Sequence, residues 1–323
     1  MTLRWGLLGT ARINRRLIPA IRASARSRLV AVGSRDSARA AAYARDWDIP
    51  EAHAPYEALL AAPLDIVYIA LPNSLHVPWT LAAVAAGRHV LCEKPLALRP
   101  EDVDAVITAS RAAGLVVTEG FMYRHHAQTT AILETLVAGA IGEVQLVSSG
   151  FSYLRERASD VRLDRALGGG VLWDIGCYPV SVAQLIAGRP TRVAGVQRIG
   201  PTGVDEMFAG TLTYRSGVVA QVSASFGAAY QAFLRIVGTH GTIAVDHPFR
   251  PARTGHFRIE RDDQVKSVTV TGNDLFVDEI TDLEDAVLGI KPPRLALEDS
   301  RSHATTLAAL HEAARTDRPV GLA

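Results

Sequence analysis

Residues 3–23 read LRWGLLGTARINRRLIPAIRA, and this stretch decides the fold. The apolar run Leu3–Leu8 predicts a buried strand, and the small residues of Gly9–Arg12 predict a turn. Apolar residues at helical spacing follow in Ile13–Ala23, which predicts an amphipathic helix. A strand, a glycine turn and a helix in this order form the first element of a dinucleotide-binding fold.

The turn meets the dinucleotide pattern G-x-G-x-x-G at only one of its three glycine positions. Gly9 is in place, whereas Ala11 and Asn14 occupy the other two positions. Asn14 is the poorer match, so the strand–turn–helix context carries the prediction. The free N–H groups at the start of the helix would bind a pyrophosphate. The residues expected to contact the cofactor here are Gly9, Thr10, Ala11, Arg12 and Ile13.

Alternating strands and helices continue to about residue 120. Strands are predicted at Arg28–Gly33, Leu64–Leu71, His89–Cys92 and Leu115–Thr118, and helices at Ser37–Trp47, Pro78–Ala86 and Pro100–Ala113. This alternation predicts a parallel sheet with helices on both faces. Ligands of such sheets bind at the carboxyl ends of the strands, so the residues that follow each strand are the candidates for a site.

The residues after the second strand favour NADP(H) over NAD(H). Sites for NAD place an acid there, which binds the ribose 2′-hydroxyl, whereas NADP sites use arginine. This chain has Ser34-Arg35, and Asp36 comes one or two positions late. A hydroxyl and a guanidinium suit a 2′-phosphate, because arginine matches phosphate geometry. A solvated turn with incidental charges is the alternative.

The fourth of these strands ends on Glu93-Lys94-Pro95, and an acid and a base at a buried strand end are unusual. Lys94 is one of only three lysines among the 34 lysine and arginine residues of the chain. Lysine can lose its proton when it is desolvated, whereas arginine effectively cannot. The triplet therefore indicates either a catalytic lysine or a surface salt bridge, and its place at the ligand-binding edge favours the first.

The second half of the chain has a different pattern. Strands are predicted at Glu143–Ser152, Arg192–Ile199, Met207–Tyr214, Val218–Phe226, Phe233–Val237, Thr242–Val245, Phe257–Arg261 and Lys266–Val270, and helices at Thr129–Ala138, Asp278–Val287 and Glu298–Ala314. Hairpin signals between the strands predict an α+β domain with a largely antiparallel, open-faced sheet. We expect residues 1–122 to form the Rossmann domain and residues 123–323 to form the second domain, whose last helix could pack back on the first.

Within this half, the stretch from Gly168 to Pro179 carries chemistry. Three successive glycines from Gly168 allow the backbone to come close to another group. Because Pro179 lacks an N–H, a helix is expected to start near Ile175, with Asp174 and Tyr178 about one turn apart. A carboxylate beside a phenol is a usable acid/base pair. The alternative is a capping aspartate and a core tyrosine.

Composition excludes several classes of function. The net charge is +1 over 323 residues, so no bulk field argues for binding to nucleic acid or a membrane. Cys92 and Cys177 make neither a disulfide framework nor a metal pattern, and no metal is expected. The start of the chain shows no signal peptide, and no apolar stretch approaches the roughly 20 residues of a membrane span. These features predict a cytoplasmic protein.

Together, four motifs resemble those of the Gfo/Idh/MocA oxidoreductases over essentially the whole chain. They are Gly9-Thr10-Ala11, Glu93-Lys94-Pro95, the segment from Glu119 to Arg124, and Gly168-Gly169-Gly170 with Asp174 and Tyr178. Many members carry histidine at the last position, and the tyrosine resembles the subgroup with glucose–fructose oxidoreductase, NADP-dependent xylose dehydrogenase, dimeric dihydrodiol dehydrogenase and sugar 3-ketoreductases.

The resemblance implies roles for particular residues. Lys94 and Tyr178 would meet at the reacting carbon, with Asp174 in support, and the bond before Pro95 would be cis. The loop with Leu71, Pro72, Asn73 and His76 would lie beside the nicotinamide, and His76 could equally be structural. Glu93 would anchor the cofactor or the lysine. Arg124 and Arg162 are candidate cations on the substrate or cofactor side.

The predicted reaction is hydride transfer between NADP(H) and a carbinol or carbonyl carbon of a sugar-like substrate. Tyr178 is expected to be the acid/base and Lys94 its electrostatic partner, while the swapped assignment stays open. The alternatives are a trans-dihydrodiol-type dehydrogenase and a non-catalytic NADP-binding regulator. Within such a family, the antiparallel sheet implies a homodimer or homotetramer.

Overall fold

The computed structural model describes residues 2–155 and 160–322. Contacts between residues divide the chain into two units. The first unit comprises Met1–Met122 and Phe276–Arg301, and the second comprises Tyr123–Leu275 and Ser302–Ala323. The segment 276–301, which the sequence analysis assigned to the second domain, thus groups with the first unit.

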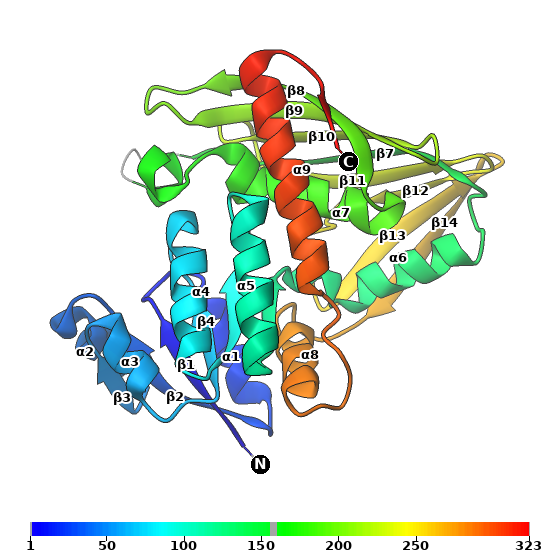
Figure 1. The fold of residues 1–323 in the computed structure, drawn as a ribbon. Helices are drawn as coiled ribbons and strands as arrows, with labels where there is room; N and C mark the ends of the chain where they lie inside the picture. The colour runs from blue at the N-terminus through cyan, green and yellow to red at the C-terminus, as the bar shows by residue number, and fades with distance from the viewer. Residues whose placement is uncertain (1, 156–159, 323) are drawn as a thin grey trace. The chain divides into compact units, whose positions relative to one another are not determined.

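The first unit is built on a six-stranded sheet in which every strand pairs in parallel with its neighbours (Figure 1). Its strands are β1 (Leu3–Leu8), β2 (Ser27–Gly33), β3 (Glu51–His53), β4 (Ile66–Ile69), β5 (His89–Glu93) and β6 (Val117–Gly120). The order β3-β2-β1-β4-β5-β6 is that of the doubly wound dinucleotide-binding fold. The predicted fold class of this half is confirmed.

Helices connect these strands, as parallel pairing requires. They are α1 (Asn14–Ala23), α2 (Ser37–Asp46), α3 (Tyr56–Ala61), α4 (His76–Ala85) after the short η1 (Asn73–Leu75), and α5 (Pro100–Ala113), with α8 (Val277–Val287) added from the far end of the chain. The sequence analysis missed β3 and α3. Both are very short, so neither leaves a periodic pattern to detect.

The second unit contains a nine-stranded sheet of order β14-β13-β12-β11-β7-β10-β9-β8-β15. The strands are β7 (Val144–Ser152), β8 (Pro190–Ile199), β9 (Asp205–Tyr214), β10 (Val219–Ser225), β11 (Gln231–Gly238), β12 (Thr242–Val245), β13 (Thr254–Arg261), β14 (Gln264–Thr271) and β15 (Val320–Gly321). Every pair is antiparallel except β7 with β10, which is parallel. The predicted, largely antiparallel sheet is confirmed.

The helical segments of this half are η2 (Met122–Arg124), α6 (Ala127–Val137), η3 (Val161–Leu163), η4 (Arg165–Leu167), the π-helical η5 (Leu172–Gly176), α7 (Cys177–Ala187) and α9 (Leu297–Thr316). The division between the units falls inside α9. By length and composition alone, the helical stretch Arg165–Ala187 is long and apolar enough to cross a membrane. The sequence analysis predicted no membrane span. However, 78% of its apolar window is buried inside the protein, as in the core helix of a globular domain.

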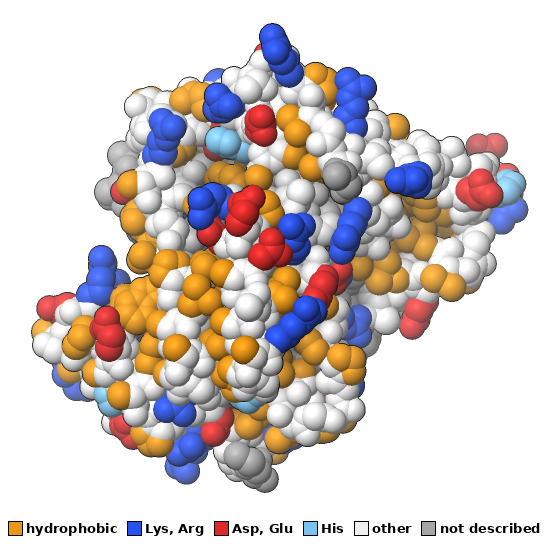
Figure 2. Space-filling model, viewed as in Figure 1, with side chains coloured by type: hydrophobic (Ala, Val, Ile, Leu, Met, Phe, Trp, Pro, Cys, Tyr) orange, Lys and Arg blue, Asp and Glu red, His pale blue; other side chains and the backbone are white. Residues whose placement is uncertain are grey.

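Charged side chains of both signs are mixed on the face of the molecule that Figure 2 shows. On the face seen in Figure 2, lysine and arginine side chains stand beside aspartate and glutamate side chains, without a broad area of one sign. The mixture agrees with the net charge of +1. This face therefore supplies no single-sign field that would attract a polyanion.

Candidate active site

Gly9 closes the turn after β1 because no other residue fits there. Its φ is +110°, which residues with a Cβ rarely adopt. A Cβ at this position would lie 2.9 Å from the carbonyl oxygen of Ala70, just past the end of β4. The Gly9 N–H donates to the carbonyl oxygen of Gly33 at 3.0 Å, so the turn is held between the two neighbouring strands.

Asn14, at the position where the pattern expects a third glycine, makes a hydrogen bond to the glycine turn. Its side chain is fully buried, and Nδ2 donates to the carbonyl oxygen of Gly9 at 2.9 Å. The amide therefore ties the start of α1 back to the turn. Residue Ile13, which precedes the helix, makes no side-chain cap, and the first turn contains no acid. The first N–H groups of α1 are thus suited to an anion.

Asp36, the acidic residue after β2 that could have bound the ribose of NAD, caps the helix that follows it. Asp36 precedes α2, and its Oδ1 accepts a hydrogen bond from the Arg39 N–H at 2.7 Å. Ser34 is buried and accepts from the Asp36 N–H at 3.4 Å, while Arg35 is exposed. Because Asp36 caps α2, its carboxylate is committed to the backbone.

Arg39 adds a second guanidinium that sequence reasoning missed. Its Nε donates to Thr10 Oγ1 at 2.7 Å and so links α2 to the glycine turn. Burial raises the pKa of Tyr56, and both Arg35 and Arg39 act in the opposite direction, which locates the two cations around one phenol. Arg35 precedes the helix and Arg39 lies in its first turn, so their closeness in the sequence was the available signal.

His76, at the start of α4, is buried, and backbone groups occupy its ring. Nδ1 lies 2.7 Å from the carbonyl oxygen of Pro95, and Nε2 lies 2.8 Å from the carbonyl oxygen of Leu71. The ring therefore joins the segment after β4 to the segment after β5. Burial lowers the pKa of His76, the two carbonyl groups oppose this shift, and Lys94 adds to it. Of the loop residues expected at the nicotinamide, Leu71, Pro72 and Asn73 are partly buried.

The Glu93-Lys94-Pro95 segment leaves β5 with its backbone fixed on both sides. The Lys94–Pro95 peptide bond is cis, which confirms that prediction. Beyond it, the Leu96 N–H donates to Glu119 Oε1 at 2.9 Å, and Glu119 is buried at the end of β6. Strand β6 pairs with β5, so the carboxylate of one strand holds the chain that leaves the other.

In the second unit, the three glycines approach neighbouring backbone and a buried carboxylate. A Cβ at Gly170, where φ is +130°, would come closer than 3.0 Å to Asp205 Oδ1. At Gly169, a Cβ would collide in the same way with the carbonyl oxygen of Arg162. Asp205 is buried and accepts from the Leu172 N–H at 2.8 Å, which caps the helix that follows. The backbone approach expected at these glycines thus serves local packing.

The helix that carries the candidate residues starts earlier than predicted. A π-helical turn, Leu172–Gly176, precedes α7, so Asp174 lies inside the helical run and does not cap it. Pro179 explains the irregular turn, because a proline crowds the carbonyl group four residues before it, here that of Ile175. Single π turns of this kind are frequent at functional sites.

Tyr153 and Arg162 both donate to the Asp174 carboxylate. Tyr153 donates its hydroxyl to Oδ2 at 2.9 Å, and Arg162 donates Nε to Oδ1 at 2.9 Å. Arg155 donates to the Tyr153 hydroxyl and pairs with Asp160 at 2.6 Å. Burial raises the pKa of Tyr153 to about 12, with help from the Asp174 charge, so the phenol stays a donor. Asp174 raises the pKa of Arg162.

Tyr153 and Arg155 were missed by the sequence analysis. Tyr153 follows the last residue of β7, twenty-one positions before Asp174, and no spacing rule links the two. The fold of the second unit alone brings them together.

Tyr178 lies in an aromatic environment. Its ring centroid is 6.1 Å from that of Tyr123, 5.7 Å from that of Phe151 and 5.4 Å from that of Phe249. The Tyr123 hydroxyl is 2.8 Å from the Ser181 hydroxyl, one turn further along α7. These contacts fix the ring in a largely apolar wall.

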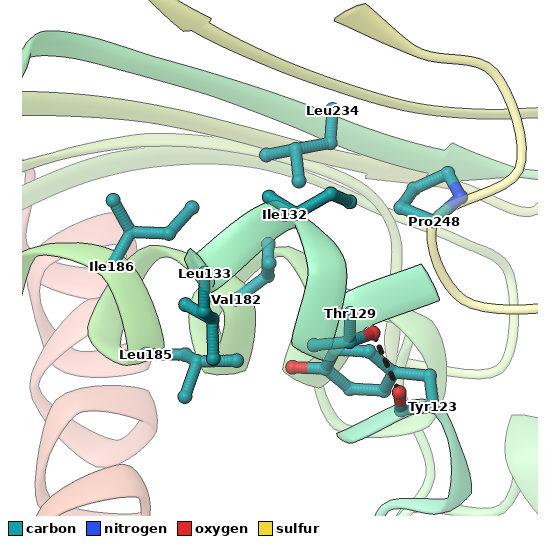
Figure 3. A pocket seen from close by; sticks show the side chains of 9 residues that line it. All are labelled: Tyr123, Thr129, Ile132, Leu133, Val182, Leu185, Ile186, Leu234 and Pro248. Atoms are coloured by element: carbon teal, nitrogen blue, oxygen red, sulfur yellow. Dashed lines mark hydrogen bonds between the residues drawn. The ribbon is translucent and has the colours of Figure 1, made fainter. Parts of the chain in front are cut away.

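A small cavity beside Tyr123 is a packing void. Figure 3 shows its lining: Tyr123, Thr129, Ile132, Leu133, Val182, Leu185, Ile186, Leu234 and Pro248. Its volume is ≈ 10 Å³, about the least that could hold one water. Thr129 donates its hydroxyl to the Tyr123 carbonyl oxygen and leaves the interior apolar. The cavity is too small for a substrate.

The structure thus assembles two groups of predicted residues, one within each unit. Leu71 and His76 meet Pro95 in the first unit, and Asp174 meets Arg162 in the second, on the helical run that carries Tyr178. Arg124 lies partly buried in η2, and its role stays a prediction. Among residues 2–155 and 160–322, no group of three or more His, Cys, Asp or Glu side chains could hold a metal.

Comparison with known families assigns both halves. Residues 3–121 match the oxidoreductase family with an NAD-binding Rossmann fold, and residues 129–244 match the GFO/IDH/MocA C-terminal domain. The chain belongs to the GFO/IDH/MocA oxidoreductase family. The predicted resemblance is confirmed.

Several relatives within the GFO/IDH/MocA family have names that specify a sugar substrate. The D-xylose 1-dehydrogenase (NADP(+)) 2 of Haloferax volcanii is 40% identical, over 98% of this chain and 99% of that protein. The dTDP-3,4-didehydro-2,6-dideoxy-alpha-D-glucose 3-reductase of Streptomyces violaceoruber is 37% identical, over 88% of this chain and 85% of that protein. The crystal structure of a 3-ketoreductase from Actinomadura kijaniata with NADP and TDP-benzene matches with a TM-score of 0.92 and 31% identity, over 97% and 98% of the two chains.

Proposed function

We propose that this chain is an NADP(H)-dependent oxidoreductase that acts on a carbinol or carbonyl carbon of a sugar or sugar derivative. The observation that carries the proposal is the 40% identity with an NADP⁺-dependent xylose dehydrogenase over nearly the whole of both chains. A regulator without turnover is less favoured, because this chain keeps Lys94, Asp174 and Tyr178, which a sensor does not need.

The first unit would bind the cofactor. The pyrophosphate would lie against the turn of residues 9–13 and the start of α1, while Ser34 and Arg35, with Arg39 beside them, would receive the 2′-phosphate. The segments at Leu71–Asn73 with His76, and at Glu93-Lys94, would border the nicotinamide. When bound, the cofactor supplies or accepts the hydride at its C4 atom.

The second unit would supply the proton chemistry. Tyr178 would act as the acid/base on the substrate oxygen, and Lys94 would stabilise charge there, or the two roles would be exchanged. Asp174, fixed by Tyr153 and Arg162, would orient a substrate hydroxyl. Because the Arg162 guanidinium already faces Asp174, its contribution to the substrate would be mainly through that carboxylate.

Tyr178→Phe and Lys94→Ala test these roles. Each should lower kcat with D-xylose and related sugars by at least about 10²-fold, while NADPH binding measured by fluorescence survives. Tyr214→Phe and Lys266→Ala are matched controls, because the Tyr214 hydroxyl has no hydrogen-bond partner among the described residues and Lys266 is exposed on β14. Unchanged turnover in either test variant would refute the role given to that residue.

A dihydrodiol is the second candidate substrate, since the aromatic rings around Tyr178 suit an apolar ring. Measuring aldoses, ketosugars and dihydrodiols against NADP⁺ and NADPH separates the two classes.

We also propose that the second unit forms a homodimer or homotetramer through its sheet. Val196 of β8 and Met207 of β9 are large apolar side chains left exposed on it. The mass in solution tests this proposal, and a cytoplasmic location remains a prediction.

A further inference from the structure

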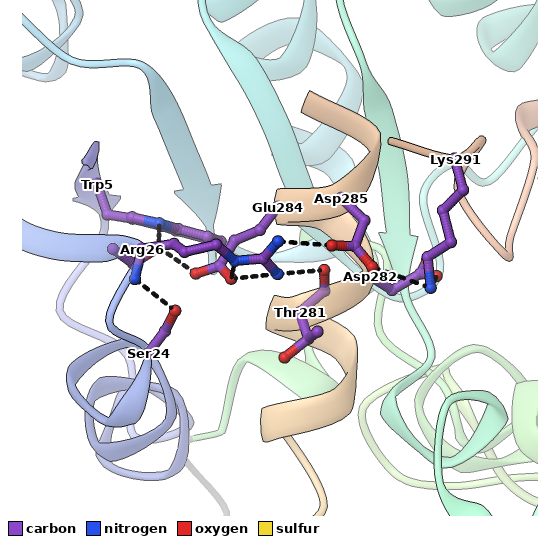
Figure 4. A network of polar contacts seen from close by, with 9 residues as sticks. Trp5, Ser24, Arg26, Thr281, Asp282, Glu284, Asp285 and Lys291 are labelled. Atoms are coloured by element: carbon purple, nitrogen blue, oxygen red, sulfur yellow. Dashed lines mark hydrogen bonds and ion pairs between the residues drawn. The ribbon is translucent and has the colours of Figure 1, made fainter. Parts of the chain in front are cut away.

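In the first unit, a polar network docks helix α8 on the start of β2 (Figure 4). Arg26 Nε donates to Glu284 Oε2 at 3.0 Å, and the Ser27 hydroxyl donates to Glu284 Oε1 at 2.5 Å. Lys291 Nζ lies 3.3 Å from Asp282 Oδ1. None of these residues belongs to the candidate active site, so this network serves the docking of a helix.

In the second unit, Asp174 and four other side chains form a closed ring of polar contacts. On one side, Tyr153 donates to Asp174 Oδ2 at 2.9 Å and accepts a hydrogen bond from Arg155. On the other side, Arg162 donates Nε to Asp174 Oδ1 at 2.9 Å and Nη1 to Asp160 Oδ1 at 3.3 Å. An ion pair of 2.6 Å between Arg155 Nη1 and Asp160 Oδ2 closes the ring.

The charges in this ring cancel. It contains two guanidinium groups and two carboxylates, and the Tyr153 phenol is neutral at neutral pH because burial raises its pKa to about 12. Among the described residues, Arg155 and Arg162 pair with no carboxylate outside the ring. The loss of one carboxylate therefore leaves one guanidinium without a counter-charge.

Asp160 is the member of the ring that bonds to both arginines. Its carboxylate also accepts from the Arg162 N–H at 3.0 Å, which fixes it to the backbone of η3. The Arg155 guanidinium is held as well, since its Cζ lies 4.8 Å from the ring centroid of Phe226 and 5.3 Å from that of Tyr153. The side chain of Asp160 is 22% exposed and that of Arg155 10%, so their charges interact more strongly than in open solvent.

Space of ligand size lies beside the ring. An open pocket of ≈ 500 Å³ has Asp160 in its wall, and its other charged lining residues, Asp164 and Arg165, are exposed and opposite in sign. Arg162 bonds to both Asp160 and Asp174. It thus connects the wall of this pocket to the carboxylate that is proposed to orient the substrate.

We propose that Asp160 is a specificity-determining residue, which cancels the charge of Arg155 and Arg162 and thereby makes the second unit select uncharged sugars over sugars that carry a carboxylate or phosphate. An anionic substituent meets the charge of Asp174 and finds both ring arginines already paired. An uncharged sugar meets no such repulsion, and its hydroxyl group donates to Asp174. This inference rests on the proposed function in placing the substrate at Asp174.

Asp160→Asn tests the inference with D-xylose and D-glucuronate, whose pyranose rings differ by one carboxylate. The ratio of kcat/KM for D-glucuronate to that for D-xylose should rise about 10-fold or more, because a released guanidinium binds a carboxylate. If D-glucuronate is not turned over, its inhibition constant against D-xylose should fall by the same factor. An equal change for both sugars would leave Asp160 a structural role alone and overturn the proposal.

Asp160→Glu keeps the charge and should keep the wild-type ratio, whereas a rise as large as that of Asp160→Asn would overturn the proposal. In Arg155→Met/Asp160→Asn the charges of the ring cancel again, so the ratio should return toward the wild-type value. A ratio that stays raised in this double variant would also overturn the proposal.

Glu260→Gln is the matched control. Glu260 likewise lies between two arginines, 2.9 Å from Arg235 and 4.0 Å from Arg258, but it is on β13 and outside the ring. Its ratio should equal that of wild type. A rise equal to that of Asp160→Asn would show a general effect of net charge and overturn the proposal.

Binding separates a failure of this inference from a failure of the proposed function. If wild type turns over no sugar at all, the proposed function fails. Calorimetry with D-glucuronate and the NADP⁺-loaded chain still tests the role of Asp160, because Asp160→Asn should bind this sugar at least about 10-fold more tightly than wild type. Equal affinities would overturn the proposal.

Discussion

Gly170→Ala should destabilise the second unit more than an ordinary glycine substitution, because the added Cβ causes both backbone strain and a collision with a buried carboxylate. A residue with a Cβ at φ +130° carries backbone strain on the order of 1–3 kcal/mol. The new Cβ would also lie closer than 3.0 Å to Asp205 Oδ1, so the carboxylate must turn away from the Leu172 N–H. A buried N–H left without its partner costs about 1–3 kcal/mol. The sum is roughly 2–6 kcal/mol, a large share of the roughly 5–15 kcal/mol that keeps a typical domain folded.

Urea unfolding followed by circular dichroism measures this loss, with Gly188→Ala as the matched control. Gly188 has φ +82° and no atom within 4 Å of a built Cβ, so only the cost of backbone strain, about 1–3 kcal/mol, applies. The Asp205→Ala variant removes the carboxylate that the new Cβ would meet. In that variant, Gly170→Ala should lower the free energy of unfolding by little more than Gly188→Ala does. If Gly170→Ala is no worse than Gly188→Ala in the wild-type background, the packing argument is wrong.

Two further predictions concern the site itself. Arg39→Ala removes a guanidinium and its bond to Thr10, and NADPH should bind about 10-fold more weakly by fluorescence titration; an equal loss for NADH would contradict a 2′-phosphate contact. Tyr153→Phe removes a donor to the Asp174 carboxylate, worth about 1.5–3 kcal/mol, and kcat should fall by about 10-fold or more. Because the pKa of Tyr153 is raised to about 12, its phenol is protonated at neutral and moderately alkaline pH. The alkaline limb of kcat should therefore stay where it is in this variant, and a shifted limb would show that the Tyr153 phenol itself titrates in that range.

Local patterns were enough for the architecture of the first unit. Apolar periodicity separates strands from helices, since side chains repeat every two residues in one and every 3.6 in the other. Gly9 could be assigned from its place between strand and helix, and Lys94 from its rarity among arginines. Both depend on a residue and its immediate neighbours.

The same reasoning misjudged Asn14 and the helix before Tyr178. Asn14 departs from the glycine pattern, yet its side-chain amide donates a hydrogen bond to the carbonyl oxygen of Gly9. This hydrogen bond joins the helix to the turn, where the pattern expects close packing at a glycine. The helix begins at a π turn that Asp205 caps from 33 positions away. A sequence pattern describes which residue types follow one another, and it does not show which side chain will bind a given backbone group.

By itself, the sequence determined the order of the longer strands and helices, the family motifs and the residue types at the candidate site. Only the tertiary structure decided which groups hold them: Tyr153 and Arg162 hold Asp174, and Glu119 holds the chain that follows Pro95. The physical reason is that hydrogen bonds and charge interactions depend on distance in space. Residues such as Arg26 and Glu284, 258 positions apart in the chain, come together only through the docking of a distant helix on the first sheet.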